Sequence, residues 1–191
     1  MFGSDDQQRL LAIARRSLDA RVRRAPDPPL DSGGALDERR GAFVSIHRGR
    51  QLRGCLGRLD SSRAVCRVVA RLAQEVTDSD PRFDPVRIEE LAHLHIEISV
   101  LSPEYEVRAV DDIVIGRHGL IVEHGGQRGL LLPQVAVEHG WDAVSFLEHT
   151  SLKAGLARGA WRDARVTSFE AQVFGERPKD GKTYSSTPAR Q

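Results

Sequence analysis

Hydrophobic residues near the start of the chain recur at intervals of three and four positions. The apolar positions of this stretch are Leu10, Leu11, Ala14, Leu18 and Val22. Because an α-helix places residues three and four apart on one face, this spacing predicts an amphipathic helix. Ser4-Asp5-Asp6 can accept hydrogen bonds at a helix start, and Pro26-Asp27-Pro28-Pro29 cannot continue a helix. The predicted helix therefore lies between these two segments.

Extended patterns follow. A strand over 41–47, a tight turn at Arg48-Gly49-Arg50 and a returning strand over 52–56 predict a β-hairpin. Farther along, apolar and polar residues alternate from Leu94 to Val100. Strict alternation is typical of a strand with one buried and one polar face. Both stretches therefore predict half-buried β-structure.

The rest of the chain mixes helical and extended segments. A second helix is predicted after the cap Asp60-Ser61-Ser62, and its buried positions are Val65, Val68, Val69, Leu72 and Val76. The predicted later elements are short strands at 113–115, 120–123 and 128–132, helices at 133–140 and 143–156, and a last long strand at 165–176. The helix at 143–156 is expected to bury Val144, Phe146, Leu147, Leu152 and Leu156. Strands arranged as hairpins, with helices between groups of strands, predict an α+β fold with mostly antiparallel sheet.

Composition narrows the class of protein. A chain of 191 residues fits one domain, or one domain with two lobes, over residues 1–176, and the polar segment 177–191 is predicted to be a disordered tail. The net charge of +1 gives no general attraction to nucleic acid, and aromatic residues that could stack on bases are sparse at 5%. Two cysteines form no disulfide framework, and no signal peptide or membrane span is predicted, so we expect a cytoplasmic protein.

The segment Arg53-Gly54-Cys55-Leu56-Gly57 carries the clearest candidate chemistry. On an extended strand, Arg53, Cys55 and Gly57 project to one face. A nearby cation favours the reactive thiolate form of a cysteine. A glycine in a strand often marks the close approach of a ligand or of another backbone, so Gly54 and Gly57 are candidate ligand-binding residues. Arg53 is a third candidate, because its guanidinium could bind an anionic or carbonyl group. The alternative is that Cys55 is a small buried hydrophobe, as free cysteines often are. Cys66, on the stripe of the second helix, is predicted to lie in the core.

Other candidate groups lie on later segments. His93, His95 and Glu97 follow one strand face and could bind a transition metal, but an exposed polar face explains them equally, so no metal site is predicted. Glu97 is instead a candidate acid–base or orienting carboxylate. His118, in a glycine turn, is a candidate base, and Gln134 is a candidate ligand contact.

Several blocks of the chain resemble the AMMECR family, whose microbial members are often called AmmeMemoRadiSam system protein A. The resemblance begins at the Arg53 to Gly57 motif and spans most of the chain. The further blocks are 80–83, 96–101, 116–120, 129–136, Trp141, Phe146-Leu147, 153–156 and 169–174. The resemblance implies a two-lobed α+β domain with the cysteine motif near a cleft between lobes. It also implies genomic company with a radical-SAM protein and with a Memo-type protein that resembles non-haem-iron dioxygenases. These are the expected partners.

Motifs that would identify a cofactor are absent from the sequence. It contains no phosphate loop, no dinucleotide fingerprint, no paired Cys-x-x-Cys pattern and no three-cysteine cluster of the radical-SAM kind. The cofactor is therefore unknown. The oligomeric state is unknown as well.

Two hypotheses for the function remain open. In the first, Cys55 is a nucleophile or sensor in a thiol-dependent catalytic or ligand site, with His118 and Glu97 assisting and Arg53 and Gln134 binding the ligand. In the second, the same segment belongs to a non-catalytic binding or adaptor module for a small anion, a nucleotide or a partner protein. Both predict that Cys55 lines a pocket with Glu97 or His118 nearby and Gln134 at its rim.

Overall fold

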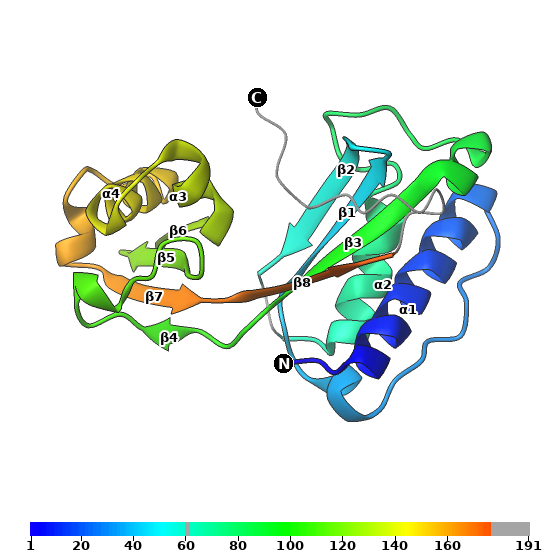
Figure 1. Ribbon diagram of the computed structural model, residues 1–191, viewed down its shortest axis with the longest axis horizontal. Helices are drawn as coiled ribbons and strands as arrows, with labels where there is room; N and C mark the ends of the chain where they lie inside the picture. Colours follow the sequence, from blue (N-terminus) through cyan, green and yellow to red (C-terminus); the bar gives the residue numbers. More distant parts are fainter. Residues whose placement is uncertain (60–61, 177–191) are drawn as a thin grey trace. The chain divides into compact units, whose positions relative to one another are not determined.

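The computed structural model has an α+β fold and describes residues 1–59 and 62–176 (Figure 1). The chain divides into two compact units. The first unit contains residues 1–101 and the final segment from Gln172 on, and the second contains residues 102–171. Each unit has a four-stranded sheet of its own, and the α+β class with antiparallel sheet agrees with the prediction. In the described part of the chain, no helix is long and apolar enough to cross a membrane.

The first unit packs two helices on one face of a sheet with strand order β2-β1-β3-β8 (Figure 1). Its regular elements are α1 (Ser4–Arg23), β1 (Ala42–Arg48), β2 (Gln51–Arg58), α2 (Val65–Glu75), β3 (Leu94–Leu101) and β8 (Ala171–Gly175), with short 3₁₀ helices η1 (Gly34–Asp37) and η2 (Ile88–His93). β1 pairs antiparallel with both β2 and β3. These elements confirm the predicted first helix, the hairpin and the strand from Leu94. The helix already begins at Ser4 with Gly3 as its N-cap, so Ser4-Asp5-Asp6 forms the first turn and not the predicted cap.

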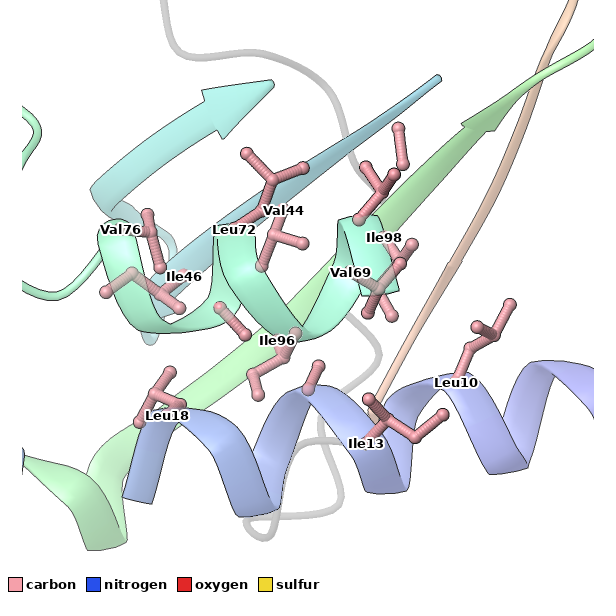
Figure 2. Close-up of a cluster of buried hydrophobic side chains, with 14 of the residues drawn as sticks. Leu10, Ile13, Leu18, Val44, Ile46, Val69, Leu72, Val76, Ile96 and Ile98 are labelled. Atoms are coloured by element: carbon pink, nitrogen blue, oxygen red, sulfur yellow. The ribbon is translucent and has the colours of Figure 1, made fainter. Parts of the chain in front are cut away.

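The core of the first unit lies between the sheet and the two helices. Figure 2 shows side chains from α1, α2, β1 and β3 meeting there. Leu10, Leu18, Val44, Ile46, Ile96 and Ile98 are fully buried. The helices contribute residues spaced three and four apart, and the strands contribute every second residue. Burying one such aliphatic side chain stabilises the fold by about 1.5–3 kcal/mol. Cys66 is 1% exposed in this core, as predicted.

The second unit has a smaller core beneath a sheet with strand order β4-β7-β5-β6. Its regular elements are β4 (Tyr105–Glu106), η3 (Val110–Asp112), β5 (Gly119–His124), β6 (Gln127–Leu131), α3 (Pro133–His139), α4 (Ala143–Lys153), η4 (Ala160–Arg162) and β7 (Arg165–Phe169). Phe146 and Leu147 of α4 pack against Leu120 and Val122 of β5 in this core. The hairpin around Gly125-Gly126 and the helix from Pro133 to Gly140 are confirmed.

Two predicted strands are wrong in detail. Residues 113–115 form no strand, because local hydrogen bonds occupy their backbone: Ile113 N donates to Val110 O, and Val114 N donates to His118 Nδ1. The last long strand is divided at Glu170, since β7 pairs in the second sheet and β8 in the first. These errors share one cause. The pattern of apolar residues does not reveal which partner a backbone segment finds.

Helices α2 and α4 differ from their predictions in small details. Val144 and Leu152 of α4 are each 41% exposed, although the apolar spacing predicted them to be buried. Helix α2 begins at Val65, and its N-cap Ala64 has no side-chain hydrogen bond. Asp60 and Ser61 of the predicted cap lie outside the described residues, as does the predicted disordered tail over 177–191.

Candidate functional site

The face of the first sheet opposite the two helices carries polar side chains, and we call it the polar face. It contains Ser45 and His47 from β1, Cys55 from β2, and His95, Glu97 and Ser99 from β3. All six residues are half-buried. Their neighbours along each strand, such as Val44, Ile46 and Ile96, point to the core instead. The alternation of core-facing and polar residues predicted for Leu94 to Val100 is therefore also found in β1 and β2.

A β-bulge decides that Cys55 belongs to the polar face. Near the turn, Arg48 pairs with Gln51 and His47 with Leu52, but the next pair is Ile46 with Gly54, which leaves Arg53 as the extra residue. Without this bulge, Cys55 would stand opposite Val44 and point into the core, because a one-residue shift reverses the face of every side chain. With it, Cys55 stands opposite Ser45.

Cys55, Ser45 and Glu97 form a row across three neighbouring strands. Ser45 pairs with Cys55 on one side and with Glu97 on the other. Strands lie about 4.8 Å apart, so the Cα atoms of Cys55 and Glu97 are separated by about 10 Å. The structure therefore brings two predicted site residues, Cys55 and Glu97, onto one surface but not into contact. A small molecule lying on the row could touch all three side chains.

Burial raises the pKa of the Glu97 carboxyl above its ordinary value. In the described part of the chain, no ion pair compensates this half-buried group. Such a carboxyl can hold a proton and donate it in a hydrogen bond, or it can accept a hydrogen bond from a bound donor. Glu97 is thus chemically suited to the acid–base or orienting role predicted for it, though its role stays a prediction.

Two stacked histidines lie next to the row. The rings of His47 and His95 are 5.1 Å apart between centroids and inclined by 15°. Burial, and in second place the neighbouring His95, lower the pKa of His47. Its ring thus favours the neutral form. In the described residues, no group of three or more histidine, cysteine or acidic side chains is arranged to hold a metal ion.

The loop Asp80-Pro81-Arg82-Phe83 holds the backbone of Cys55 from outside the sheet. β2 is an edge strand, so the Cys55 peptide groups that point away from β1 have no strand partner. Cys55 N donates to Asp80 Oδ2 at 2.9 Å, and Arg82 Nη2 donates to Cys55 O at 3.3 Å. The two side chains therefore supply the acceptor and the donor that another strand would supply.

Asp80 and Arg82 are also tied to each other. Arg82 donates to Asp80 through Nε at 3.0 Å and through Nη2 at 2.8 Å. These hydrogen bonds, together with the one from Cys55 N, lower the pKa of Asp80 to about 2, although burial opposes the shift. The Asp80 side chain is only 3% exposed. Asp80 is therefore a buried, ionised anchor of the strand that carries the cysteine.

Arg53 is engaged by another residue of the first unit. Its Nε donates to Glu90 Oε2 at 2.8 Å and its Nη2 to Glu90 Oε1 at 3.1 Å. The guanidinium that contacts Cys55 belongs to Arg82, which the sequence analysis named only as part of the family block 80–83. Arg53 therefore shapes the hairpin through its bulge and its ion pair, while its predicted ligand role stays a prediction.

The two glycines of the motif are explained by packing. A Cβ atom on Gly54 would lie 2.9 Å from Val76 O, so the close approach expected at a strand glycine is that of the backbone after α2. A Cβ atom on Gly57 would lie 2.1 Å from the ring of Phe43, which fills the space beside it. Contact of either glycine with a ligand stays a prediction.

His118 and Gln134 belong to the second unit and are described within it. His118 Nδ1 accepts a hydrogen bond from Val114 N at 3.1 Å, and Nε2 lies 3.9 Å from Glu170 Oε1. A neutral ring that accepts at Nδ1 carries its proton on Nε2, so it can donate there but cannot accept. Gln134 is exposed in the first turn of α3. The predicted meeting of these residues with Cys55 stays a prediction.

Besides Arg82, sequence reasoning missed Ser45 and Asp80 in this arrangement. Counting back from a two-residue turn pairs Ser45 with Gly54, and only the bulge pairs it with Cys55. Asp80 had a weak signal, because an Asp-Pro pair between helix and loop often uses its carboxylate to bind backbone N–H groups. The partner of that carboxylate, Cys55, is distant in sequence, and no local pattern identifies it.

Comparisons with known proteins agree with the architecture. The profile of the AMMECR1 family matches residues 11–174. A protein of Methanothermobacter thermautotrophicus is 40% identical over 185 residues, covering 90% of this chain and 95% of that protein. One of Methanosarcina mazei is 34% identical over 193 residues, covering 95% of this chain and 97% of that protein. The crystal structure of an uncharacterized protein from Pyrococcus horikoshii superposes with a TM-score of 0.75 at 37% identity, covering 91% of this chain and 92% of that one. From its motifs, its fold and these relatives, the chain belongs to the AMMECR1 family.

Proposed function

We propose that this protein binds a small ligand on the polar face of its first sheet, across the row Cys55, Ser45 and Glu97. The proposal rests on the arrangement of these three side chains. A thiol, a hydroxyl and a carboxyl lie side by side on a rigid sheet, on the side away from the helices. Rigid strands hold such groups in fixed positions, which favours recognition of one ligand geometry.

Glu97 defines the kind of group that the ligand presents. Its carboxyl lacks an ion-pair partner in the described residues, and burial raises its pKa. A ligand that brings an amine, an amide or a protonated ring nitrogen supplies the missing donor. Ser45, in the middle of the row, can donate or accept, so it suits a neighbouring polar atom of the same ligand. The ligand of this site is therefore a small molecule with at least one nitrogen donor.

A second candidate function is thiol-dependent chemistry at Cys55. What favours it is the support of the strand: the N–H and the C=O of Cys55 are both held, by Asp80 and by Arg82. A fixed and half-exposed thiol is a suitable nucleophile once a base is within hydrogen-bond distance. Among the described residues no hydrogen bond joins the thiol to a base, and Glu97 is one strand too far away to accept its proton directly. The base would then be a group of the ligand.

Nuclear magnetic resonance tests the binding site directly. The uniformly ¹⁵N-labelled protein is titrated with a fragment set of small amines, amides and carboxylates. We expect the amine and amide fragments to shift the backbone amide signals of Ser45, Cys55 and Glu97. Glu97→Gln should weaken the affinity for these fragments by about tenfold, the usual effect of losing a charge-assisted hydrogen bond. Ser79→Ala, a change at an exposed loop residue, serves as the control. Fragments that leave these three signals unmoved would refute the site.

Two substitutions of one residue separate binding from catalysis. Cys55→Ser keeps a polar group of similar size, whereas Cys55→Ala removes it. If the site only binds, Cys55→Ser should retain fragment affinity within about threefold, since a hydroxyl replaces the thiol as a weak partner. If a thiol reaction occurs, the unmodified protein forms a mass adduct with an electrophilic fragment that neither variant forms, while both variants still bind it.

We propose further, from the family resemblance, that residues 1–176 work as one AMMECR-type domain beside Memo-type and radical-SAM proteins in the cytoplasm. Co-expression of a tagged chain with these two proteins from one genome tests the partnership. We expect both to be retained on the affinity resin at moderate salt. Recovery of the tagged chain alone, under conditions in which both other proteins are soluble, would contradict it.

A further inference from the structure

The first unit contains a hollow separate from the row Cys55, Ser45 and Glu97. It has a volume of about 680 Å³ and lies between the end of the β1–β2 hairpin and the segment 84–93. Small-molecule sites in proteins usually measure about 300–1,000 Å³, so its size suits a metabolite. Its charged lining consists of Arg48, Arg53, Arg87, Asp84, Glu89 and Glu90. His93 and Pro85 complete the wall.

One ion pair, between Arg53 and Glu90, forms part of the wall of this hollow. Glu90 accepts from Arg53 with both carboxylate oxygens, at 2.8 and 3.1 Å, and its Oε1 also accepts from Arg87 N at 2.9 Å. The side chains of Arg53 and Glu90 are each only 17% exposed. These two charges therefore neutralise each other, and they fix the hairpin to the segment that carries the other lining residues.

Two guanidinium groups remain available. Arg48, at the end of β1, and Arg87, just before η2, are exposed, and neither forms an ion pair with the residues that the structure describes. Both line the same hollow. Planar guanidinium groups bind phosphate through paired N–H donors and are common at such sites. Arg48 acts on Glu90 only over a distance longer than an ion pair, and Glu90 is already paired with Arg53. A phosphate between Arg48 and Arg87 would give both of them a close ion-pair partner.

Two carboxylates restrict the class of anion. Asp84 and Glu89 are exposed on the same lining and, in the described part of the chain, have no ion-pair partner. They would repel a bare phosphate, but each can accept hydrogen bonds from hydroxyl groups. A ligand that carries a phosphate at one end and hydroxyl groups at the other matches both sets of side chains.

We propose that this hollow binds a phosphorylated polyol, with its phosphate on Arg48 and Arg87 and its hydroxyl groups on Asp84 and Glu89. Free sugar phosphates and nucleotides share this chemistry. The proposal is independent of the polar face, since none of the side chains of the row Cys55, Ser45 and Glu97 lines the hollow.

Isothermal titration calorimetry at low salt tests the proposal with three probes: ribose 5-phosphate, inorganic phosphate and free ribose. We expect ribose 5-phosphate to bind at least about tenfold more tightly than either other probe, because only it satisfies both guanidinium and carboxylate groups. Adenosine 5′-monophosphate then distinguishes the two sources: tighter binding than ribose 5-phosphate identifies a nucleotide, and weaker binding identifies a sugar phosphate. Equal affinities for ribose 5-phosphate and inorganic phosphate would overturn the proposal.

Variants with opposite expected effects make the test specific. Arg48→Ala and Arg87→Ala should each weaken ribose 5-phosphate by about tenfold, whereas Arg50→Ala, at the hairpin tip but outside the lining, should stay within about twofold. Asp84→Asn combined with Glu89→Gln should weaken ribose 5-phosphate but strengthen inorganic phosphate, because repulsion is removed. All these side chains are exposed, so the variants should fold. If Arg50→Ala weakens binding as much as Arg48→Ala, the ligand is held only by the general positive charge of the hairpin, and the proposal fails.

Discussion

Replacing Asp80 should cost more stability than replacing any neighbouring surface carboxylate. The carboxylate is 3% exposed, and its hydrogen bonds from Arg82 and from Cys55 N lower its pKa from the ordinary 3.8 to about 2. One pKa unit corresponds to about 1.4 kcal/mol, so the shift corresponds to about 2 kcal/mol of stability. Arg82 is 58% exposed, and solvent screening makes this value an upper estimate.

The sign of this contribution sets its dependence on pH. Because folding lowers the pKa of Asp80, the contribution is complete above about pH 4, and it disappears as the pH falls toward 2 and the carboxyl becomes protonated in the folded protein. Asp80→Asn carries no charge at any pH. The difference in free energy of unfolding between the unmodified protein and this variant should therefore be about 2 kcal/mol at pH 7 and should shrink as the solution is acidified below pH 4.

Urea denaturation followed by circular dichroism measures the difference at several pH values. Asp78→Asn is the matched control, since Asp78 lies two residues away and forms a more exposed ion pair with Arg21. Such a pair contributes about 0–1 kcal/mol. Hydrogen exchange at the Cys55 amide should also become faster in Asp80→Asn, because the amide loses its charged acceptor. A stability difference below about 0.5 kcal/mol, or one that does not change with pH, would refute the anchoring role.

Two further predictions concern the cysteine-bearing strand. Iodoacetamide should label Cys55 faster than Cys66 in the native protein, because Cys55 is half-exposed. Cys66 is 1% exposed, and burial raises the pKa of its thiol. Equal protection of both cysteines in a mass-spectrometric time course would contradict this prediction. Gly54→Ala should lower the free energy of unfolding by about 1–3 kcal/mol, because the new Cβ would lie 2.9 Å from Val76 O. The control Ser45→Ala, on the polar face, should change the free energy of unfolding by less than about 0.5 kcal/mol. Equal effects of the two substitutions in urea denaturation would show that the close approach at Gly54 is unimportant.

Hydrophobic spacing was sufficient to predict most of the regular elements and most of the faces that they bury. Helix α1, the β1–β2 hairpin and the inward residues of β3 follow from hydrophobic spacing, which depends only on the local geometry of helix and strand. The motif around Cys55 and the blocks after it were sufficient to indicate the family. They also singled out Cys55 and Glu97, which share one face of the first sheet.

The contacts of those residues depend on how distant segments of the chain come together in the fold. The sequence left open whether Cys55 lies in the core or on a polar surface, and the extra residue Arg53 in β2 settles the choice by shifting the register by one. The same holds for Glu90, which pairs with Arg53, and for Asp80, which holds the Cys55 backbone. Periodicity is set by the conformation of each residue, whereas strand register and loop contacts are set by groups far apart in the chain. That is why the pattern of the sequence predicted the strands, while their partners became visible only in the folded protein.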